Sequence, residues 1–187
     1  MSTLLAAALP PPWRRAEWRR LDPVADLDLL CDWMHAPHVV PFWDLAVSRP
    51  QLAAYLRAAA ADDNQDVLVG AVDGEPMSYW EVYWAERDRL AAFCPTQPFD
   101  QGVHLLIGPV AMTGLGLGRH LLDAVSGWLL DREPRTERLL AEPDIRNDRS
   151  IRLFERCGFS RTAALTLPEK RAALMVRRRP AGAEHLR

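Results

Sequence analysis

Two stretches in the first third of the chain place apolar residues three and four positions apart, which is the period of a helix. The first stretch begins at Asp22 and Pro23, a favourable N-cap and first helical position. The second begins at Ser48, which has capping-box spacing to Gln51, and ends near residue 61. The buried faces are expected to consist of Leu27, Leu30, Cys31 and Met34 in the first helix and Leu52, Tyr55, Leu56 and Ala59 in the second.

The pattern changes at residue 66 to β-rich runs. Residues 66–72 and 76–84 are joined by Asp73 and Gly74, the strongest short signal for a β-hairpin. Shorter runs predict further strands at 17–21, 102–110, 137–143, 160–167 and 170–179. Two more helices are expected, one after the glycines near residue 116 and ending at Pro134, the other over 147–157 and closed by Gly158.

The order of these elements is β, α, α, β, β, β, α, β, α, β, β. It predicts an α/β fold in which four helices flank a mixed, mostly antiparallel central sheet of six to seven strands. We expect a flexible leader at 1–16, a single domain at 17–179 and a C-terminal tail at 180–187.

Composition narrows the class of protein. The 187 residues are 49% hydrophobic and 26% charged with a net charge of -2, so neither nucleic acid nor an anionic membrane is indicated as a partner. No apolar stretch has the length of a membrane helix, and three unpaired cysteines fit a cytoplasmic protein with reduced thiols. The histidines lack metal-ligand spacing, so no metal is expected.

Gly114, Gly116 and Gly118 follow an apolar strand and open a helix. Bare backbone N–H groups at a helix N-terminus form an anion cradle suited to a pyrophosphate. Taken alone, glycines in this pattern more often form just a tight turn than a phosphate site. The absence of a Gly-Lys-Ser/Thr triplet excludes a P-loop.

The segment from Thr113 to Arg119 resembles the acyl-CoA-binding motif of the GNAT acyltransferases, with Thr113 near the position of the usual Arg or Gln. "NDRSIRLFERCGF" resembles the signature on the fourth helix of that family. The resemblance implies the GNAT fold and acyl-CoA as co-substrate. The CoA-contacting residues that it implies are Thr113, Gly114, Leu115, Gly116, Leu117, Gly118, Arg119, Asn147, Ser150 and Phe154. Ile107 is added to them as a candidate backbone donor to the thioester carbonyl.

"YWEVYW", "DQGVHLLIGP" and "AEPDIRN" resemble a narrower branch, the siderophore-biosynthesis enzymes that acylate N-hydroxylated diamines or amino acids to hydroxamates. That branch implies His104 and Asp144 as the catalytic pair. Acyl transfer to an amine needs a proton acceptor, and an imidazole titrates near neutral pH. Without the motifs, His104 is more typical of a structural polar group and Asp144 of a turn or cap, and Glu142 is a rival for the acidic role.

Two further points bear on the donor side. The family's acidic tyrosine on the fourth helix is replaced by Phe154, so the CoA thiolate takes a proton from water or Ser150, or leaves as the anion. Asn147 is either a contact to CoA or the N-cap of the helix.

On the acceptor side, Tyr79, Glu81 and Tyr83 share one face of a strand. They are candidates to line the cleft, with Glu81 or Asp44 meeting a charged end; the equal alternative is a core of aromatic residues. The loop before the second helix adds Trp43 and, ranked below it, His38 as candidates for substrate binding.

The favoured function is acyl-CoA-dependent N-acylation of an N-hydroxylated diamine or amino acid, of the N-hydroxycadaverine or N-hydroxylysine type, to a hydroxamate for siderophore assembly. The enzyme is expected to be a monomer or homodimer that acts on a small hydroxylamine or amine. An aminoglycoside 6′-N-acetyltransferase is the first alternative, but it predicts a cleft with several carboxylates. The segments "VPFWD" and "YWEVYW" look too aromatic and too sparsely acidic for such a cleft. A non-catalytic acyl-CoA-binding module is the second alternative, and His104 counts against it.

Overall fold

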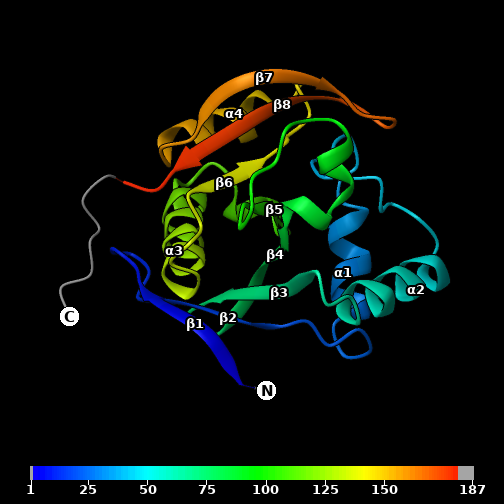
Figure 1. The fold of residues 1–187 in the computed structure, drawn as a ribbon. Coiled ribbons are helices and arrows are strands. Elements are labelled where there is room, and N and C mark those ends of the chain that lie inside the picture. Colours follow the sequence, from blue (N-terminus) through cyan, green and yellow to red (C-terminus); the bar gives the residue numbers. More distant parts are fainter. Residues whose placement is uncertain (1, 181–187) are drawn as a thin grey trace.

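One eight-stranded sheet runs through the protein, and helices cover both of its faces (Figure 1). The computed structural model describes residues 2–180. The spatial order of the strands is β1-β2-β3-β4-β5-β6-β8-β7. Neighbouring strands are antiparallel except for β5 and β6, which are parallel. The strands are β1 (Thr3–Ala8), β2 (Arg15–Arg20), β3 (Gln65–Val72), β4 (Glu75–Trp84), β5 (Gln101–Ile107), β6 (Arg138–Ala141), β7 (Ser160–Thr166) and β8 (Arg171–Arg178).

The four helices pack in pairs on opposite faces. Helices α1 (Leu27–Met34) and α2 (Arg49–Ala60) share a core with Val67, Val69 and Leu106 on one face of the sheet. Helices α3 (Leu117–Arg132) and α4 (Asp148–Arg156) cover the other face over a core that includes Trp80 and Val103. Burial of these apolar faces is the main favourable term that holds the three layers together.

The hairpin of β3 and β4 forms as the sequence predicts. Asp73 and Gly74 both have positive φ, at 50° and 91°, as the tight turn requires. The capping box also forms, since the Ser48 N–H donates to Gln51 Oε1 at 3.1 Å. None of the helices in residues 2–180 is long and apolar enough to span a bilayer.

Two boundaries differ clearly from the expectation. Helix α1 begins at Leu27 rather than at Asp22, because the Asp22 carboxylate caps a preceding turn by accepting the N–H groups of Val24 and Ala25. Strand β5 ends at Ile107 instead of continuing to 110, and a 3₁₀ turn over Val110–Met112 follows Pro109.

The expected flexible leader is wrong for Thr3–Ala8. This segment is strand β1 and pairs antiparallel with β2, which brings the sheet to eight strands. Its small apolar residues show no alternation, so the sequence pattern carried no strand signal. Pro180 is the last described residue, and the rest of the predicted tail lies outside the described residues.

Strands β5 and β6 are hydrogen-bonded only at their beginnings. The parallel register pairs Gln101 with Leu139 and Gly102 with Leu140, and no further pairs form. Beyond these two pairs the strands diverge, and the cavity described below is lined by Val103 and Leu105 on one side and Ala141 on the other. The divergence therefore opens the sheet at the point where β5 carries its histidine.

Candidate active site

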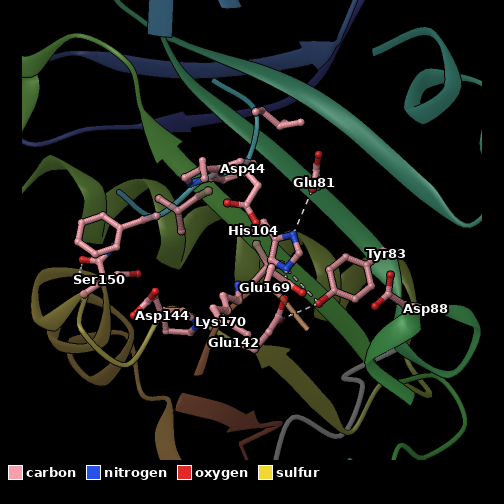
Figure 2. A pocket seen from close by; sticks show the side chains of 18 of the residues that line it. Asp44, Glu81, Tyr83, Asp88, His104, Glu142, Asp144, Ser150, Glu169 and Lys170 are labelled. Atoms are coloured by element: carbon pink, nitrogen blue, oxygen red, sulfur yellow. Dashed lines mark hydrogen bonds and ion pairs between the residues drawn. The ribbon is translucent and has the colours of Figure 1, made fainter. Parts of the chain in front are cut away.

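A cavity of about 470 Å³ occupies the opening between β5 and β6. Ser150 of α4 lies toward one end of it and Asp88 toward the other (Figure 2), and Phe154 of α4 and Tyr55 of α2 also line it. His104 lies between the two ends, and Figure 2 shows its ring with carboxylates on either side. The cavity is thus bounded by two helices from opposite faces of the sheet.

His104 is held between two buried carboxylates. It lies opposite Glu81 in the register of β4 and β5, and its Nδ1 is 3.1 Å from Glu81 Oε2. Its Nε2 contacts Glu142 Oε1 on the other side. Burial opposes the charged form, but Glu142 and Glu81 outweigh it and raise the pKa of His104 to about 10. His104 is therefore an imidazolium at neutral pH.

The Glu81 carboxylate is fixed by two tyrosines. Tyr55 and Tyr79 donate their hydroxyls to Glu81 Oε1 at 2.6 Å and 2.7 Å. Burial raises the pKa of Glu81, but its hydrogen bonds to His104 and the tyrosines outweigh burial, so the net pKa is lowered and the group stays ionised. Tyr55 was expected on the buried face of its helix; instead its side chain lies at the cavity with 36% of the residue exposed.

Glu142 is the direct partner of His104 on the β6 side. The two β5–β6 pairs join residues 38 positions apart, and the same offset separates His104 from Glu142. Tyr83 donates its hydroxyl to Glu142 Oε2 at 3.0 Å. Although burial opposes its ionised form, the charge of His104 lowers the pKa of Glu142 to about 2. The rival that the sequence left open is thus the residue in contact.

Asp144 lines the same cavity but is directed elsewhere. Its carboxylate binds Arg146 through Nε at 3.0 Å and Nη2 at 2.7 Å, and this contact lowers its pKa. Its backbone forms an isolated bridge with Ala172 of β8. The predicted pair of His104 and Asp144 is therefore brought into one cavity without a hydrogen bond between the two side chains.

The other candidates on the acceptor side divide into two groups. The Trp43 ring lines the cavity, with its centroid 5.6 Å from that of Tyr79 and 6.3 Å from that of His104. Tyr83 also lines it. Tyr79 is fully buried and is not among the lining residues, while His38 binds the Ile107 carbonyl at 2.9 Å through Nε2. His38 therefore attaches the loop that carries Trp43 to the end of β5.

The glycine loop lies beyond the cavity, at the start of α3. Gly114 and Gly116 have φ of 77° and 81°, a conformation that favours glycine, and α3 begins at Leu117. The backbone of Gly114, Leu115 and Gly116 is exposed, as an anion cradle requires. The Arg149 guanidinium lies beside Gly114, since a Cβ there would be 3.2 Å from Nη2. Sequence reasoning missed this cation.

The remaining residues of this segment have structural partners. Gly118 packs against α4, where a Cβ would meet Leu153 at 3.3 Å. The side chain of Leu117 is fully buried in the core, so it presents only its backbone to a ligand. The Thr113 hydroxyl donates to the Val110 carbonyl at 2.8 Å, and Arg119 is exposed beside Asp123. In this segment, the exposed backbone and the exposed Arg119 side chain, which is paired with Asp123, are accessible to a phosphate.

The edge of β5 that faces the opening offers backbone donors. The Gly108 N–H donates to Met77 on β4. Because antiparallel pairing alternates along a strand, the N–H groups of Leu105 and Ile107 are directed to the opposite edge. Ile107 was expected to be such a donor, and Leu105 was not.

Asn147, just before α4, and Phe154 of α4 each make a structural contact and also line the cavity. Asn147 Oδ1 accepts the Ser150 N–H at 3.1 Å, so Asn147 is the N-cap, and it also lines the cavity. Phe154 packs edge-on against Phe159 with ring centroids 5.0 Å apart. A phenyl ring has no proton to donate at this position.

The expectation of a sparsely acidic cleft is wrong. Six carboxylates line the cavity: Asp44, Glu81, Asp88, Glu142, Asp144 and Glu169. Glu81 and Glu142 bind His104, Asp144 binds Arg146, and Glu169 binds Arg89 at 2.6 Å. The sequence hid this charge because two of the six, Asp88 and Glu169, lie in turns outside the quoted segments. In residues 2–180, no cluster of three or more His, Cys, Asp or Glu side chains has the geometry of a metal site.

A diverging parallel strand pair, a glycine loop opening a helix and an asparagine-capped helix at the cavity occur here together. A family model described as an acetyltransferase (GNAT) domain matches residues 22–167. The chain belongs to the GNAT acetyltransferase family. Its four helices and mostly antiparallel sheet form the GNAT fold, as the sequence motifs implied.

Curated relatives within the family are similar to most of the chain. An N(6)-hydroxylysine O-acetyltransferase from Escherichia coli is 34% identical over 87% of this chain and 52% of its own length. An N-hydroxyputrescine acetyltransferase from Acinetobacter baumannii is 36% identical over 64% of this chain and 56% of its own. The chain thus spans about half the length of these relatives. The resemblance to GNAT enzymes that acylate N-hydroxylated amines is confirmed.

Solved GNAT structures superimpose on the same region. An uncharacterized protein from Bacillus halodurans is 40% identical with a TM-score of 0.84, covering 88% of this chain and 84% of that one. AAC(6′)-Ib in complex with paromomycin and acetyl-CoA is 26% identical with a TM-score of 0.76, covering 88% and 93%. Both branches weighed from the sequence therefore occur among the similar proteins.

Proposed function

We propose that this GNAT protein transfers an acyl group from acyl-CoA to the hydroxylamine nitrogen of an N-hydroxylated diamine or amino acid, forming a hydroxamate for siderophore assembly. The observation that carries the proposal is the contact of both ring nitrogens of His104 with Glu81 and Glu142 in the cavity where β5 and β6 diverge. The acceptors named for the relatives, hydroxylysine and hydroxyputrescine, support this substrate class. Acetyl-CoA and succinyl-CoA are the donors we propose, and the cytoplasm is the location.

The acyl-CoA is proposed to lie along the opening, with its pyrophosphate on the glycine loop. The exposed backbone of Gly114 to Gly116 and the Arg149 guanidinium supply donors and positive charge at that end. The N–H groups of Leu105 and Ile107 are placed to bind the pantetheine and to polarise the thioester carbonyl. A similar structure with acetyl-CoA bound supports this co-substrate.

The acceptor is proposed to approach His104 from the end lined by Trp43 and Tyr55. Asp44 and Asp88 line the cavity and form no ion pair within residues 2–180, and we propose that they supply the negative charge that meets the acceptor. An acceptor with an ammonium at its far end complements that charge, and the Trp43 ring can cover its methylene stem. In this arrangement His104 Nε2 exchanges protons with the reacting nitrogen, and Glu142 is its charge partner.

Asp144 retains a proposed role near the reaction. Its carboxylate lines the cavity between His104 and α4, and Arg146 holds it in place. We propose that it contacts the incoming hydroxylamine rather than the imidazole.

The test is release of free CoA from acetyl-CoA and succinyl-CoA with N-hydroxycadaverine, N6-hydroxylysine and kanamycin as acceptors. The proposal predicts turnover with at least one hydroxylamine and little with kanamycin. Turnover with kanamycin and none with either hydroxylamine would overturn it.

A second candidate function is acetylation of an aminoglycoside. The six carboxylates of the cavity favour it, since aminoglycosides are polycations, and so does the similarity to AAC(6′)-Ib. Four of those carboxylates are already bound to His104, Arg146 or Arg89, which leaves two for an acceptor. This count fits a small acceptor with one or two amines better than a polycationic trisaccharide.

A further inference from the structure

The contacts of His104 fix how many protons the active site holds at rest. An ionised carboxylate only accepts hydrogen bonds, and a neutral imidazole has a single N–H. Both ring nitrogens of His104 nevertheless contact carboxylates, Nδ1 with Glu81 and Nε2 with Glu142. His104, Glu81 and Glu142 together therefore hold one proton more than a neutral imidazole between two ionised carboxylates would hold.

The two contacts are not equivalent in their position. Nδ1 is directed toward Glu81 on β4 (Figure 2). Glu81 accepts the hydroxyls of Tyr55 and Tyr79 on its other oxygen. Nε2 is directed across the opening toward the end of β6, which is where acyl-CoA lies in the function proposed above. The Glu81 side is thus the fixed side of the ring, and the Nε2 side faces the reaction.

Other ionisable groups surround the cluster and do not reverse its charge. Glu81 is 7% exposed and Glu142 is 4% exposed, so solvent screens neither carboxylate strongly. The other titratable groups that line the cavity or hydrogen-bond the two carboxylates are Asp44, Tyr55, Tyr79, Tyr83, Asp88, Arg89, Asp144, Glu169 and Lys170. Arg89 and Lys170 are cations, and Arg89 is paired with Glu169.

We propose that His104 enters the reaction as a proton donor: Nε2 gives its proton to the departing sulfur and then recovers one from the acceptor. Glu81, held by Tyr55 and Tyr79, is the positioning residue that keeps a proton on Nδ1 throughout. The proposal rests on the acyl transfer proposed above. It assigns to His104 the proton donation to the CoA thiolate that Phe154 cannot perform.

The proton balance closes over one cycle. The acceptor nitrogen attacks the thioester carbon, a C–N bond forms, and the carbonyl electron pair moves to oxygen. When that oxygen re-forms the C=O bond, the C–S bond breaks and sulfur takes the proton from His104 Nε2. The protonated nitrogen of the product then returns a proton to Nε2. CoA leaves as the thiol, the product is neutral, and the cluster ends as it began.

The first experiment reads the ring in the free protein. Two-bond ¹H–¹⁵N correlation spectra between pH 6 and 10.5, with the His104 signals assigned by comparison with His104→Gln, report both nitrogens. We expect an imidazolium at pH 7 and, in the high-pH form, a proton on Nδ1. Glu81→Gln should lower the titration midpoint by about one to three pH units, as loss of a hydrogen-bonded charge does, and Tyr55→Phe by less. Asp131→Asn, an exposed carboxylate outside the cavity, is the matched control and should shift nothing.

The second experiment follows the rate against pH with a hydroxylamine acceptor, after subtraction of the uncatalysed reaction. A proton donor predicts a kcat/KM that falls as pH rises through the His104 midpoint, and Glu81→Gln should move that fall to lower pH with the KM for acyl-CoA unchanged. Three results would each overturn the proposal. They are a neutral His104 ring at pH 7, equal His104 titration midpoints in Glu81→Gln and the unmodified protein, and a rate that rises with pH through that midpoint. If no hydroxylamine is acylated, the proposed function fails, and the spectra still decide the protonation and positioning of the ring.

Discussion

The ring of Tyr83 lies directly over Gly102. A Cβ at Gly102 would be 2.0 Å from the ring carbon Cζ, so only glycine leaves room for the ring in this position. From there the hydroxyl reaches Glu142 at 3.0 Å and lies 3.3 Å from His104 Nε2. A backbone position on β5 thus determines how the carboxylate beyond β6 is held.

Gly102→Ala should displace Tyr83 and loosen Glu142. We expect a loss of about 1–3 kcal/mol in the free energy of unfolding from overpacking, together with a lower kcat. Gly127→Ala is the matched control, because a Cβ at this helical glycine meets nothing within 4 Å. It should raise stability by about 0.5–1 kcal/mol and leave kcat unchanged. Urea unfolding and steady-state kinetics measure both. Equal effects of the two substitutions would argue against the role of Tyr83.

His104→Ala should lower kcat by about 10²- to 10⁴-fold, the usual contribution of an acid–base group. The dissociation constant for CoA, measured by calorimetry, should change little, because the proposed pyrophosphate site is at Gly114 and Arg149, beyond the cavity lining. Full activity in this variant would remove His104 from the chemistry.

Glu142→Gln and Asp144→Asn separate the two candidate acids. Loss of the Glu142 charge should lower the pKa of His104 and reduce kcat, because Glu142 contacts Nε2 directly. Asp144→Asn should leave the His104 titration nearly in place, since Asp144 binds Arg146 instead. If Asp144→Asn shifted the His104 midpoint as far as Glu142→Gln, the observed register would not describe the working site.

Arg149→Ala tests the anion cradle. Removal of the guanidinium beside Gly114 should weaken CoA binding by about tenfold, or about 1.4 kcal/mol, with kcat preserved at saturating acyl-CoA. Arg152→Ala on the same helix is the control, because Arg152 is exposed and pairs with Asp148. Equal weakening by both variants would indicate general charge attraction rather than a local site.

Stability should depend on pH through His104. Its pKa is raised from 6.5 to about 10 in the folded protein, so the folded state binds more protons than the unfolded state between these values. The stabilisation is complete below pH 6.5 and is lost as pH rises toward 10, by at most about 1.4 kcal/mol per pH unit. Urea unfolding at pH 7, 8 and 9 should show a decline that His104→Gln lacks. Parallel curves would contradict the raised pKa.

Much of the fold could be predicted from the sequence because its strands and helices carry strong local signals. The Asp73–Gly74 turn and the capping box at Ser48 are local features that formed as expected. The apolar faces of the helices also formed, except that Tyr55 lies at the cavity. Strand β1 was missed because Thr3–Ala8 has small apolar residues without alternation, and only pairing with β2 makes it a strand.

The sequence predicted which residues belong to the site, but not which acidic residue contacts His104. Motifs indicated His104 and both acidic candidates, but the choice between Glu142 and Asp144 depends on where β5 and β6 first pair. That register, with an offset of 38 residues, is a tertiary property that neither strand encodes alone. Tyr55 was misassigned for the same reason, because a helical period shows which face is apolar but not where a cavity opens.

The most direct test of the proposed function is the identity of the product formed from acetyl-CoA and N-hydroxycadaverine or N6-hydroxylysine. Mass spectrometry combined with the coloured Fe(III) complex of hydroxamates distinguishes acylation at nitrogen from acylation at oxygen. We predict a hydroxamate that accumulates in proportion to released CoA and is absent with His104→Ala. An O-acyl product, or CoA release without either acylated hydroxylamine, would contradict the proposed function.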